Sequence, residues 1–400
     1  MYACHVQWVL LSIAITAAAT PVEFRNTRAA FTVPQSVKKP FVKTGPAALA
    51  ALYRKYNKVA PHAVKTAATN VKGTVPASPE DYDSEYLSTV SIGGQTVNLN
   101  FDTGSSDLWV FSSQLKDSLK QDHDVYSPSI SRGSRLLAGE YWTILYGDNS
   151  EAEGNVYLDT VKVGATTAIN QAVEAAQSVS TSFEQDIDSD GILGLAFDLV
   201  NQIKPDRQKT FFSNVRSTLA APLFTVDLKR GKPGSYDFGY VDDSKHTGSI
   251  TYVPVDSRNG FWGFTSNGYA VGNSGFTSTR IDAIMDTGTS LILLPEAVVT
   301  AYYKQVPSAI YSEEQGGWTL PCIAAPPSIT LGFGWYKAVV PGSYINYGPV
   351  ESGGVLCYGG IQKNSGIGFS IFGDVFIKSQ FVVFDASGPR LGVAPKMLQS

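Results

Sequence analysis

The 400-residue sequence predicts a mainly β protein built from two related, β-rich lobes. Gly, Ser, Thr, Tyr and Val are abundant and only 16% of residues are charged, a composition that favours strands and turns over helices. Short strand–turn units recur from about residue 86 to the end of the chain. One eight-residue pattern also occurs twice, about one domain length apart, which indicates a repeat of whole lobes.

The first 20 residues are typical of a secretory signal peptide. An apolar run, Val9–Ala19, ends in three alanines, as small-residue cleavage sites do. No Lys or Arg precedes the run, so a buried N-terminal helix is the alternative. The run is too short to span a bilayer comfortably, and the C-terminal residues are polar. We therefore expect a secreted protein with no membrane anchor, in preference to a vacuolar one.

Charge divides the rest of the chain. Residues 21–77 contain ten Lys or Arg and one acidic residue, a net charge of +9, whereas residues 78–400 contain 21 basic and 34 acidic residues, a net charge of −13. A basic arm can indicate nucleic-acid binding, but after a signal peptide we expect no nucleic-acid partner. We interpret 21–77 as an inhibitory propeptide that ends between residues 67 and 78. An N-terminal lobe, 78–250, and a C-terminal lobe, 251–400, would follow it.

Two segments have a clear local pattern. Pro46–Lys58 in the basic region is compatible with a helix. Leu87–Ile92 and Val97–Phe101 flank a Gly93-Gly94 pair, which predicts a β-hairpin because glycines readily adopt the positive φ angles of tight hairpin turns.

The repeated pattern centres on two aspartates that are 184 residues apart. Phe101-Asp102-Thr103-Gly104-Ser105-Ser106 matches Met285-Asp286-Thr287-Gly288-Thr289-Ser290. An apolar segment containing glycine follows each copy, at 191–197 and at 370–376. One Asp-Thr-Gly is weak evidence, but the repeat predicts that Asp102 and Asp286 meet on a pseudo-two-fold axis between the lobes.

Two carboxyl groups held close together cannot both ionise easily, so they share a proton. One can then take a proton from an attacking water while the other donates to the peptide carbonyl. The titration belongs to the pair, so neither residue is assigned as acid or base. Asp102 and Asp286 are the predicted catalytic residues.

Their neighbours have matching expected roles. Gly104 and Gly288 allow tight turns and donate backbone N–H groups to the carboxylates. The hydroxyls of Ser105 and Thr289 lie within reach of the outer carboxylate oxygens, and those of Thr103 and Thr287 reach the opposite loop. Ordinary turn chemistry is the alternative explanation for these small polar residues.

On these motifs the chain resembles the pepsin family of aspartic peptidases, and most of all its secreted fungal members, over about residues 86–394. The resemblance implies a cleft between the lobes, covered by a hairpin called the flap. Trp142-Thr143-Ile144-Leu145-Tyr146-Gly147-Asp148 resembles the flap, with Tyr146 as its aromatic residue and Trp109 as the indole that hydrogen-bonds to it. Without the resemblance, Tyr146 would be an ordinary strand residue.

The resemblance also implies substrate-binding residues. Gly147, Asp148 and Ser150 align with flap positions near the side chain before the cleaved bond. A carboxylate at Asp148 would pair with a Lys ammonium, so we expect Lys as well as large apolar residues to be accepted there. A solvent-exposed turn is the alternative. Phe183 and Ile192 resemble apolar walls of the same pocket, with core packing as their alternative.

In the basic segment, the stretch around Lys55 and Tyr56 resembles the propeptide region whose lysine sits on the two aspartates. Lys55 is preferred to Lys58 because an aromatic residue, Tyr56, follows it. The expected partners are peptide and protein substrates and pepstatin-type inhibitors, and the protein is expected to be a monomer.

Three cysteines are present, and Cys4 lies in the signal peptide. Cys322 and Cys357 form an even pair in an exported chain, which predicts a disulfide. Two unpaired buried thiols are the alternative.

Other hydrolase classes lack their motifs. The sequence contains no Gly-x-Ser-x-Gly, no His-Glu-x-x-His and no phosphate-cradling Gly-x-Gly-x-x-Gly in a strand–helix setting. We therefore expect no cofactor and no metal site. The alternative from another class is a catalytically inactive binding or inhibitor protein with the same fold.

Overall fold

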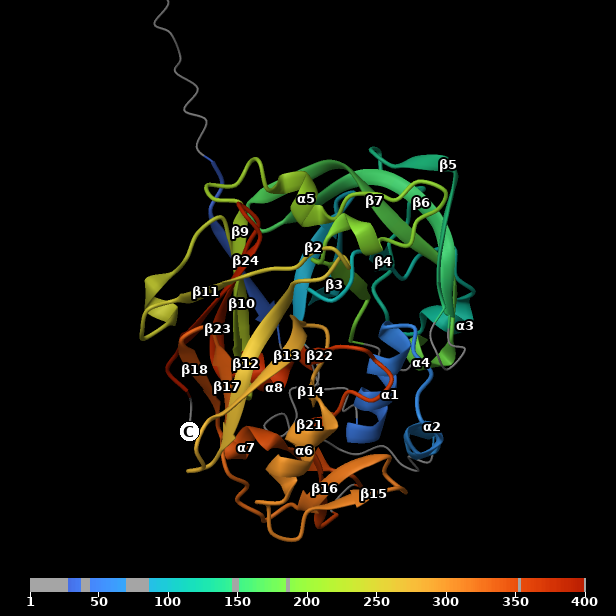
Figure 1. Cartoon of the computed structure of the whole chain (residues 1–400). Coiled ribbons are helices and arrows are strands. Elements are labelled where there is room, and N and C mark those ends of the chain that lie inside the picture. Colours follow the sequence, from blue (N-terminus) through green and yellow to red (C-terminus); the bar gives the residue numbers. More distant parts are fainter. Residues whose placement is uncertain are drawn as a thin grey trace, which may run out of the picture.

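The computed structural model describes residues 28–36, 44–69, 86–145, 151–184, 188–351 and 354–398. The fold is mainly β and has two lobes, which confirms the predicted fold class. Figure 1 shows strands β2–β8 in the upper part of the molecule and strands β12–β22 in the lower part. The boundary at residue 250 stays a prediction, because one sheet contains strands from both parts of the chain.

The largest sheet runs through both lobes. Its described strands, in spatial order, are β11 (Thr251–Pro254), β24 (Arg390–Pro395), β23 (Gln380–Asp385), β9 (Leu223–Lys229), β10 (Lys232–Phe238), β1 (Phe31–Ser36), β2 (Leu87–Ile92), β3 (Gln95–Asp102), β8 (Gly191–Gly194), β4 (Leu108–Val110), β7 (Thr166–Val179), β6 (Glu151–Val163) and β5 (Arg135–Leu145).

Two further sheets belong to the lower part. The first has the order β18 (Tyr336–Val340), β17 (Ile329–Phe333), β12 (Gly263–Val271), β13 (Thr277–Met285), β22 (Ser370–Phe372), β14 (Ile292–Leu294) and β21 (Ile361–Lys363). The second has the order β15 (Ile310–Ser312), β16 (Gly317–Pro321), β20 (Leu356–Gly359) and β19 (Asn346–Pro349).

The helices are short and lie at strand ends or on the sheet surfaces. They are α1 (Gly45–Lys55), α2 (His62–Thr69), α3 (Asp117–Lys120), α4 (Thr181–Glu184), α5 (Phe211–Val215), α6 (Glu296–Tyr303), α7 (Gly342–Ile345) and α8 (Asp374–Ile377), with 3₁₀ turns η1 (Asp198–Val200) and η2 (Asp243–Lys245). No helix in the described ranges is long and apolar enough to cross a membrane.

The sequence repeat is also a repeat of strand order. In the upper part β3, β8, β4 and β7 lie side by side, and in the lower part β13, β22, β14 and β21 do so in the same sense. β3 pairs in parallel with β8, as β13 does with β22, and β4 runs antiparallel to β8, as β14 does to β22. Each aspartate therefore lies at the carboxyl end of an interior strand with a parallel neighbour.

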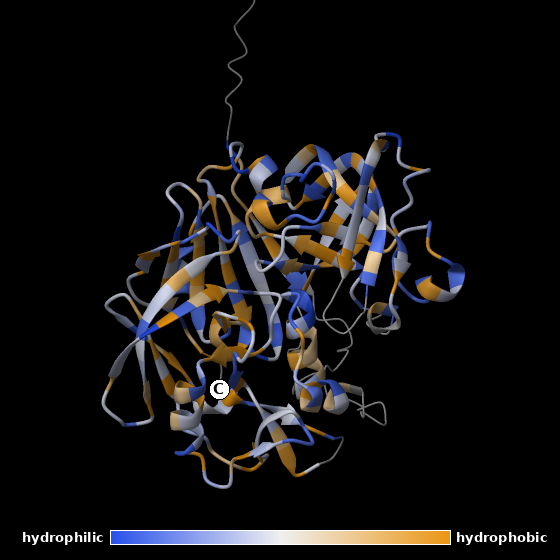
Figure 2. Cartoon of the chain, turned by 45° about the vertical axis from the view of Figure 1, so that its right-hand side comes forward, coloured by the Kyte–Doolittle hydropathy of each residue, from blue (hydrophilic) through white to orange (hydrophobic). Residues whose placement is uncertain are grey.

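The predicted hairpin is present. β2 and β3 pair from Ile92↔Gln95 to Leu87↔Asn100, and Gly93 and Gly94 both have positive φ. Side chains that face the core alternate with exposed ones along many strands, so hydrophobic and hydrophilic residues alternate in Figure 2. The interior aromatic residues, such as Phe224 and Phe384 stacked at 4.7 Å, belong to the core at the sheet that both parts share.

The helix expected within Pro46–Lys58 is α1. The Thr44 hydroxyl accepts from Ala47 N, Pro46 lies in the first turn, and Lys55 in the last turn complements the helix dipole. Leu49, Leu52 and Tyr53 form the buried side of α1 and pack in one cluster with Leu293 and Tyr358 of the lower part. In Figure 1 the helix lies to the right of β14, whose Leu293 it contacts. Packing of this apolar face holds the helix against the body of the protein.

The predicted disulfide is present. Cys322 and Cys357 are bonded, with sulfur atoms 2.04 Å apart, and they link the end of β16 to β20.

Candidate active site

Asp102 and Asp286 lie at the meeting point of the two parts of the molecule. Asp102 ends β3, where its carbonyl accepts from Leu195 N. Asp286 follows β13, and its N–H donates to Phe372 O. Their exposed fractions are 2% and 0%. Such burial of two carboxyl groups is costly unless hydrogen bonds and charges compensate for it.

The residues after each aspartate supply those hydrogen bonds in the same way. Gly104 N donates to Asp102 Oδ1 at 2.8 Å, and Gly288 N donates to Asp286 Oδ1 at 3.0 Å. Ser105 Oγ donates to Asp102 Oδ2 at 2.6 Å, and Thr289 Oγ1 donates to Asp286 Oδ2.

Both glycines also allow the carboxyl groups to come close together. A Cβ at Gly104 would lie 2.5 Å from Asp286 Oδ1, and one at Gly288 would collide with Asp102 Oδ1. Each glycine therefore lies directly against the opposite carboxyl group, and any larger residue would push the two aspartates apart.

The two threonines join the loops across the interface. Thr103 N donates to Thr287 Oγ1, and Thr287 N donates to Thr103 Oγ1, both at 3.0 Å. Each hydroxyl then donates to a carbonyl of the opposite strand, Thr103 to Met285 O and Thr287 to Phe101 O. The structure thus brings together all eight residues predicted for the catalytic pair and its support.

Lys55 lies on both aspartates. Its Nζ is 2.7 Å from Asp102 Oδ1, 2.7 Å from Asp286 Oδ1 and 2.9 Å from Asp286 Oδ2. The Tyr56 hydroxyl donates to Asp286 Oδ2 at 2.5 Å. The ring of Tyr56 is held edge-on by Phe261 and Phe369, at 5.7 and 5.2 Å.

Burial and charge act in opposite directions on these groups. Burial raises the pKa of Asp102, and Lys55 offsets only part of the effect. Burial also acts to raise the pKa of Asp286, but Lys55, together with hydrogen bonds from Thr289 and Tyr56, outweighs it and lowers that pKa. Burial acts to lower the pKa of Lys55, but the two carboxylates outweigh it and raise that pKa. The cation is therefore retained because it neutralises the pair.

The predicted substrate-binding residues fall into two groups. Tyr146, Gly147, Asp148 and Ser150 lie outside the described residues. Trp109, Phe183 and Ile192 belong to one apolar cluster beside the Asp102 loop, with Trp109 stacked on Trp142 at 6.0 Å and edge-on to Phe183 at 5.3 Å. The Trp109 Nε1 donor is buried and has no partner among the described residues.

Phe261 and Phe369, which hold Tyr56, were not singled out from the sequence. Both belong to aromatic-rich stretches, Gly260–Gly263 and Phe369–Phe372, in which any of several rings can face the core. The sequence signal that could have indicated them is their position just before β12 and β22. Both strands pair with β13, which leads to Asp286.

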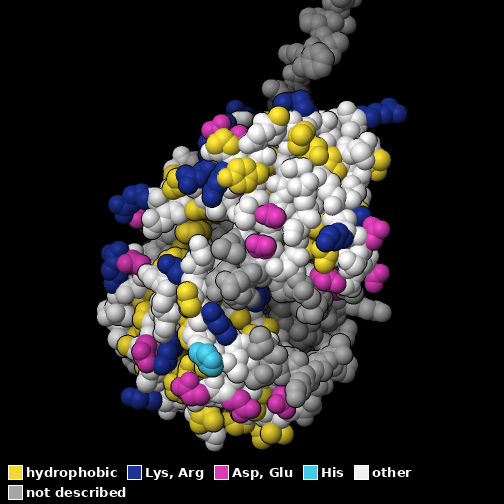
Figure 3. Space-filling view, turned by 90° about the vertical axis from the view of Figure 1, so that its right-hand side faces the viewer, with side chains coloured by type: hydrophobic (Ala, Val, Ile, Leu, Met, Phe, Trp, Pro, Cys, Tyr) yellow, Lys and Arg dark blue, Asp and Glu magenta, His cyan; other side chains and the backbone are white. Residues whose placement is uncertain are grey.

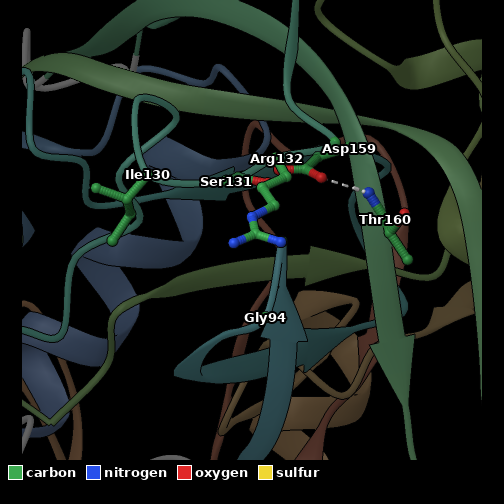
Figure 4. A pocket seen from close by; sticks show the side chains of 8 residues that line it. Gly94, Ile130, Ser131, Arg132, Asp159 and Thr160 are labelled. Atoms are coloured by element: carbon green, nitrogen blue, oxygen red, sulfur yellow. Dashed lines mark hydrogen bonds between the residues drawn. The ribbon is translucent and has the colours of Figure 1, made fainter.

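Two other features of the surface lie away from this site. A hollow of about 350 Å³ lies between the β2–β3 turn and residues 130–133, with Arg132 over Gly94 and Asp159 accepting from Thr160 N (Figure 4). It contains no predicted site residue.

On the face drawn in Figure 3, acidic and basic side chains are interspersed. In the described ranges no cluster of three or more His, Cys, Asp or Glu is arranged to hold a metal ion.

Comparison with known proteins agrees with this geometry. A family model described as "Eukaryotic aspartyl protease" matches residues 85–396. Penicillopepsin-3 of Penicillium janthinellum is 52% identical over 394 residues, covering 98% of this chain and 99% of the relative. Aspergillopepsin-1 of Aspergillus fumigatus is 51% identical over 392 residues, covering 97% and 98%. Penicillopepsin-1 of Penicillium rubens is 50% identical over 387 residues, covering 96% of each chain.

Proposed function

The chain belongs to the eukaryotic aspartyl protease family and is an aspartic endopeptidase, and from this premise we propose that it is a secreted enzyme, made as a latent zymogen and active in acid. Asp102 and Asp286 are its catalytic pair. The observation that carries the proposal is the Lys55 ammonium, which bridges the two Oδ1 atoms that face each other.

The bridged oxygens define the reaction centre. When Lys55 leaves, Asp102 Oδ1 and Asp286 Oδ1 are the two acceptors able to hold one water between them. One carboxyl group takes a proton from the water as it attacks the peptide carbonyl, and the other donates its proton to the carbonyl oxygen. Gly104, Gly288 and the two hydroxyls bonded to the outer oxygens keep the carboxyl planes fixed during this exchange, so little reorganisation is needed.

Latency follows from the same contacts. At neutral pH the cation pairs with both carboxylates, and Tyr56 fills the space between Phe261 and Phe369. Because Lys55 lowers the pKa of Asp286 in the docked state, docking is stabilised above the normal carboxyl range. That stabilisation is lost as the pH falls through the lowered pKa. Acid thereby releases the segment that contains Lys55 and Tyr56, and it supplies the proton that catalysis needs.

The layout of the chain fits this sequence of events. We assign residues 1–20 to a signal peptide, 21–77 to the propeptide with its end between 67 and 78, 78–250 to the N-terminal lobe with the flap and 251–400 to the C-terminal lobe. The propeptide contributes more than α1, because β1 lies between β10 and β2 in the large sheet. Its removal takes a whole strand from that sheet.

The proposed substrates are proteins and peptides with a large apolar residue before the cleaved bond, or Lys through pairing with Asp148. The apolar cluster of Trp109, Phe183 and Ile192 supports the first preference. Monomeric enzyme and inhibition by pepstatin-type compounds are part of the same proposal.

Cleavage of haemoglobin at about pH 4 tests the proposal, since one carboxyl group must be protonated. We expect cleavage to be blocked by pepstatin and lost in Asp102→Asn and in Asp286→Asn, while both variants fold. Pepstatin-insensitive cleavage would contradict the assignment of the pair. A folded, processed chain without activity would instead support the inactive binding protein.

A further inference from the structure

A second pair of buried carboxyl groups lies behind the loop that carries Asp102. Asp107 and Glu174 have exposed fractions of 4% and 0%. Asp107 comes just before β4, and Glu174 lies on β7, where it pairs with Trp109 of β4 on one side and Val156 of β6 on the other. The proposed reaction uses neither group.

The contacts of the pair are few and shared. Asn201 Nδ2 donates to Asp107 Oδ1 at 2.9 Å and to Glu174 Oε1 at 3.3 Å. Gln202 N donates to the same Asp107 oxygen at 2.7 Å. Glu174 Oε2 is buried without a donor among the described residues.

Because one nitrogen, Asn201 Nδ2, reaches an oxygen of each, the two carboxyl groups lie side by side. Carboxylates have no donor of their own, so a hydrogen bond between them needs a proton. No neighbouring cation in the described ranges compensates for the charge that the pair would carry without that proton. Asp102, from β3, is a third acid, and within the described ranges neither carboxyl group forms a salt bridge with Lys, Arg or His. Two uncompensated anions at this depth would be very costly.

We propose that Asp107 and Glu174 share a proton in the weakly acidic range, and that this protonated pair positions the loop of Asp102. Glu174 Oε2, which has no donor among the described residues, is the oxygen available to carry the proton. The arrangement is a second proton-sharing carboxyl pair, structural where the first is catalytic.

The link to Asp102 runs through the loop itself. Asn201 Nδ2, which donates to both carboxyl groups, also donates to Ser106 O at 3.3 Å, and Gly194 N donates to Asp107 O. Asp107, Glu174 and Asn201 are therefore positioning residues, and this part of the inference rests on the proposed role of Asp102. Ionisation of the pair would force Asp107 and Glu174 apart and displace the end of the loop.

The pH dependence has a defined direction. Burial raises the pKa of Asp107 to about 7, and burial together with Asp107 raises the pKa of Glu174 well above its usual value. In the unfolded chain both groups ionise near pH 4. The folded state therefore binds more protons than the unfolded state between about pH 4 and 7. For each extra proton that the folded state binds, the folding equilibrium constant falls about tenfold when the pH rises by one unit.

Urea unfolding of the full chain at about pH 5.5 to 7.0, above the acid range expected for conversion, tests the shared proton. Glu174→Gln keeps a neutral donor beside Asp107 and needs no proton. We expect the folding constant of the wild type to fall at least about tenfold more per pH unit than that of Glu174→Gln. Glu153→Gln, the same change at an exposed position of β6, should behave like the wild type. Parallel pH curves for the wild type and Glu174→Gln would overturn the shared proton.

Asp107→Asn offers the same unfolding test from the other side, since Asn can donate to Glu174. It should also flatten the dependence of the folding constant on pH.

The positioning role has its own readout in the mature enzyme. Glu174→Leu, which cannot donate, should lower kcat about tenfold or more relative to Glu174→Gln, with a smaller change in KM. Equal kcat values for the Gln and Leu variants would overturn that role. Because unfolding needs no activity, the shared proton stays testable even if the proposed function fails.

Discussion

Replacing Lys55 by Met is the most direct perturbation of the proposed zymogen. Met keeps much of the apolar volume of the Lys stem but removes the ammonium that contacts three carboxylate oxygens of Asp102 and Asp286. At neutral pH the variant places two buried carboxyl groups side by side without a cation. They then have to take up a proton or separate from the docked segment.

The size of the effect follows from burial. The Lys55 side chain is 14% exposed and its two partners are at most 3% exposed. Removal of one member of such a buried ionic group typically costs about 3 to 5 kcal/mol. If that cost falls on docking, the ratio of molecules with an open cleft to molecules with a docked segment at pH 7 rises by about two to four orders of magnitude.

The assay is the conversion of purified full-length zymogen to the shorter mature form, followed over time at a series of pH values. The wild type should stay latent near pH 7 and convert steeply in acid. Lys55→Met should convert at higher pH and depend less on pH, because protonation of the pair no longer breaks an ion pair. Lys58→Met, a change three residues along outside this contact, is the matched control and should remain latent. Full latency of Lys55→Met at pH 7 would refute the reasoning.

Two further predictions concern specificity and stability. Asp148→Ala should lower kcat/KM for peptides with Lys before the cleaved bond about tenfold more than for peptides with Phe, because a charge-assisted hydrogen bond is lost; equal losses on both would contradict the pairing. Replacement of Cys322 and Cys357 by Ala opens a crosslink between residues 35 positions apart and should cost about 4 kcal/mol on the chain-entropy estimate, and an unchanged urea midpoint would show that this estimate fails here.

The proposed catalytic centre was predictable because it is repeated. Asp102 and Asp286 each follow an apolar strand, and each is followed by small polar residues. One such motif is weak evidence for a site, whereas its repetition is strong evidence for a pair. The contacts that support them are local, from residues two or three positions along the chain. Short-range geometry of this kind can be inferred from sequence.

The contacts between residues far apart in the sequence were harder to predict. The bonds of Lys55 to the aspartates join residues 47 and 231 positions apart, and only the resemblance to a family indicated them. Asp107 and Glu174 looked like ordinary acidic residues, since nothing in the sequence says that Asn201 will reach both. The place of β1 within the large sheet was also missed, because a six-residue strand has little pattern of its own.

The large sheet also constrains the order in which the chain can fold. β9 pairs with β23, in the register Val226↔Val382, and β23 pairs with β24 at the end of the chain. Lys396 donates to Asp227 Oδ1 at 2.9 Å across the same region. During synthesis the edge of β9 therefore stays open until the last strands have left the ribosome. Such late, non-local pairing slows folding and leaves strand edges exposed to aggregation in the meantime.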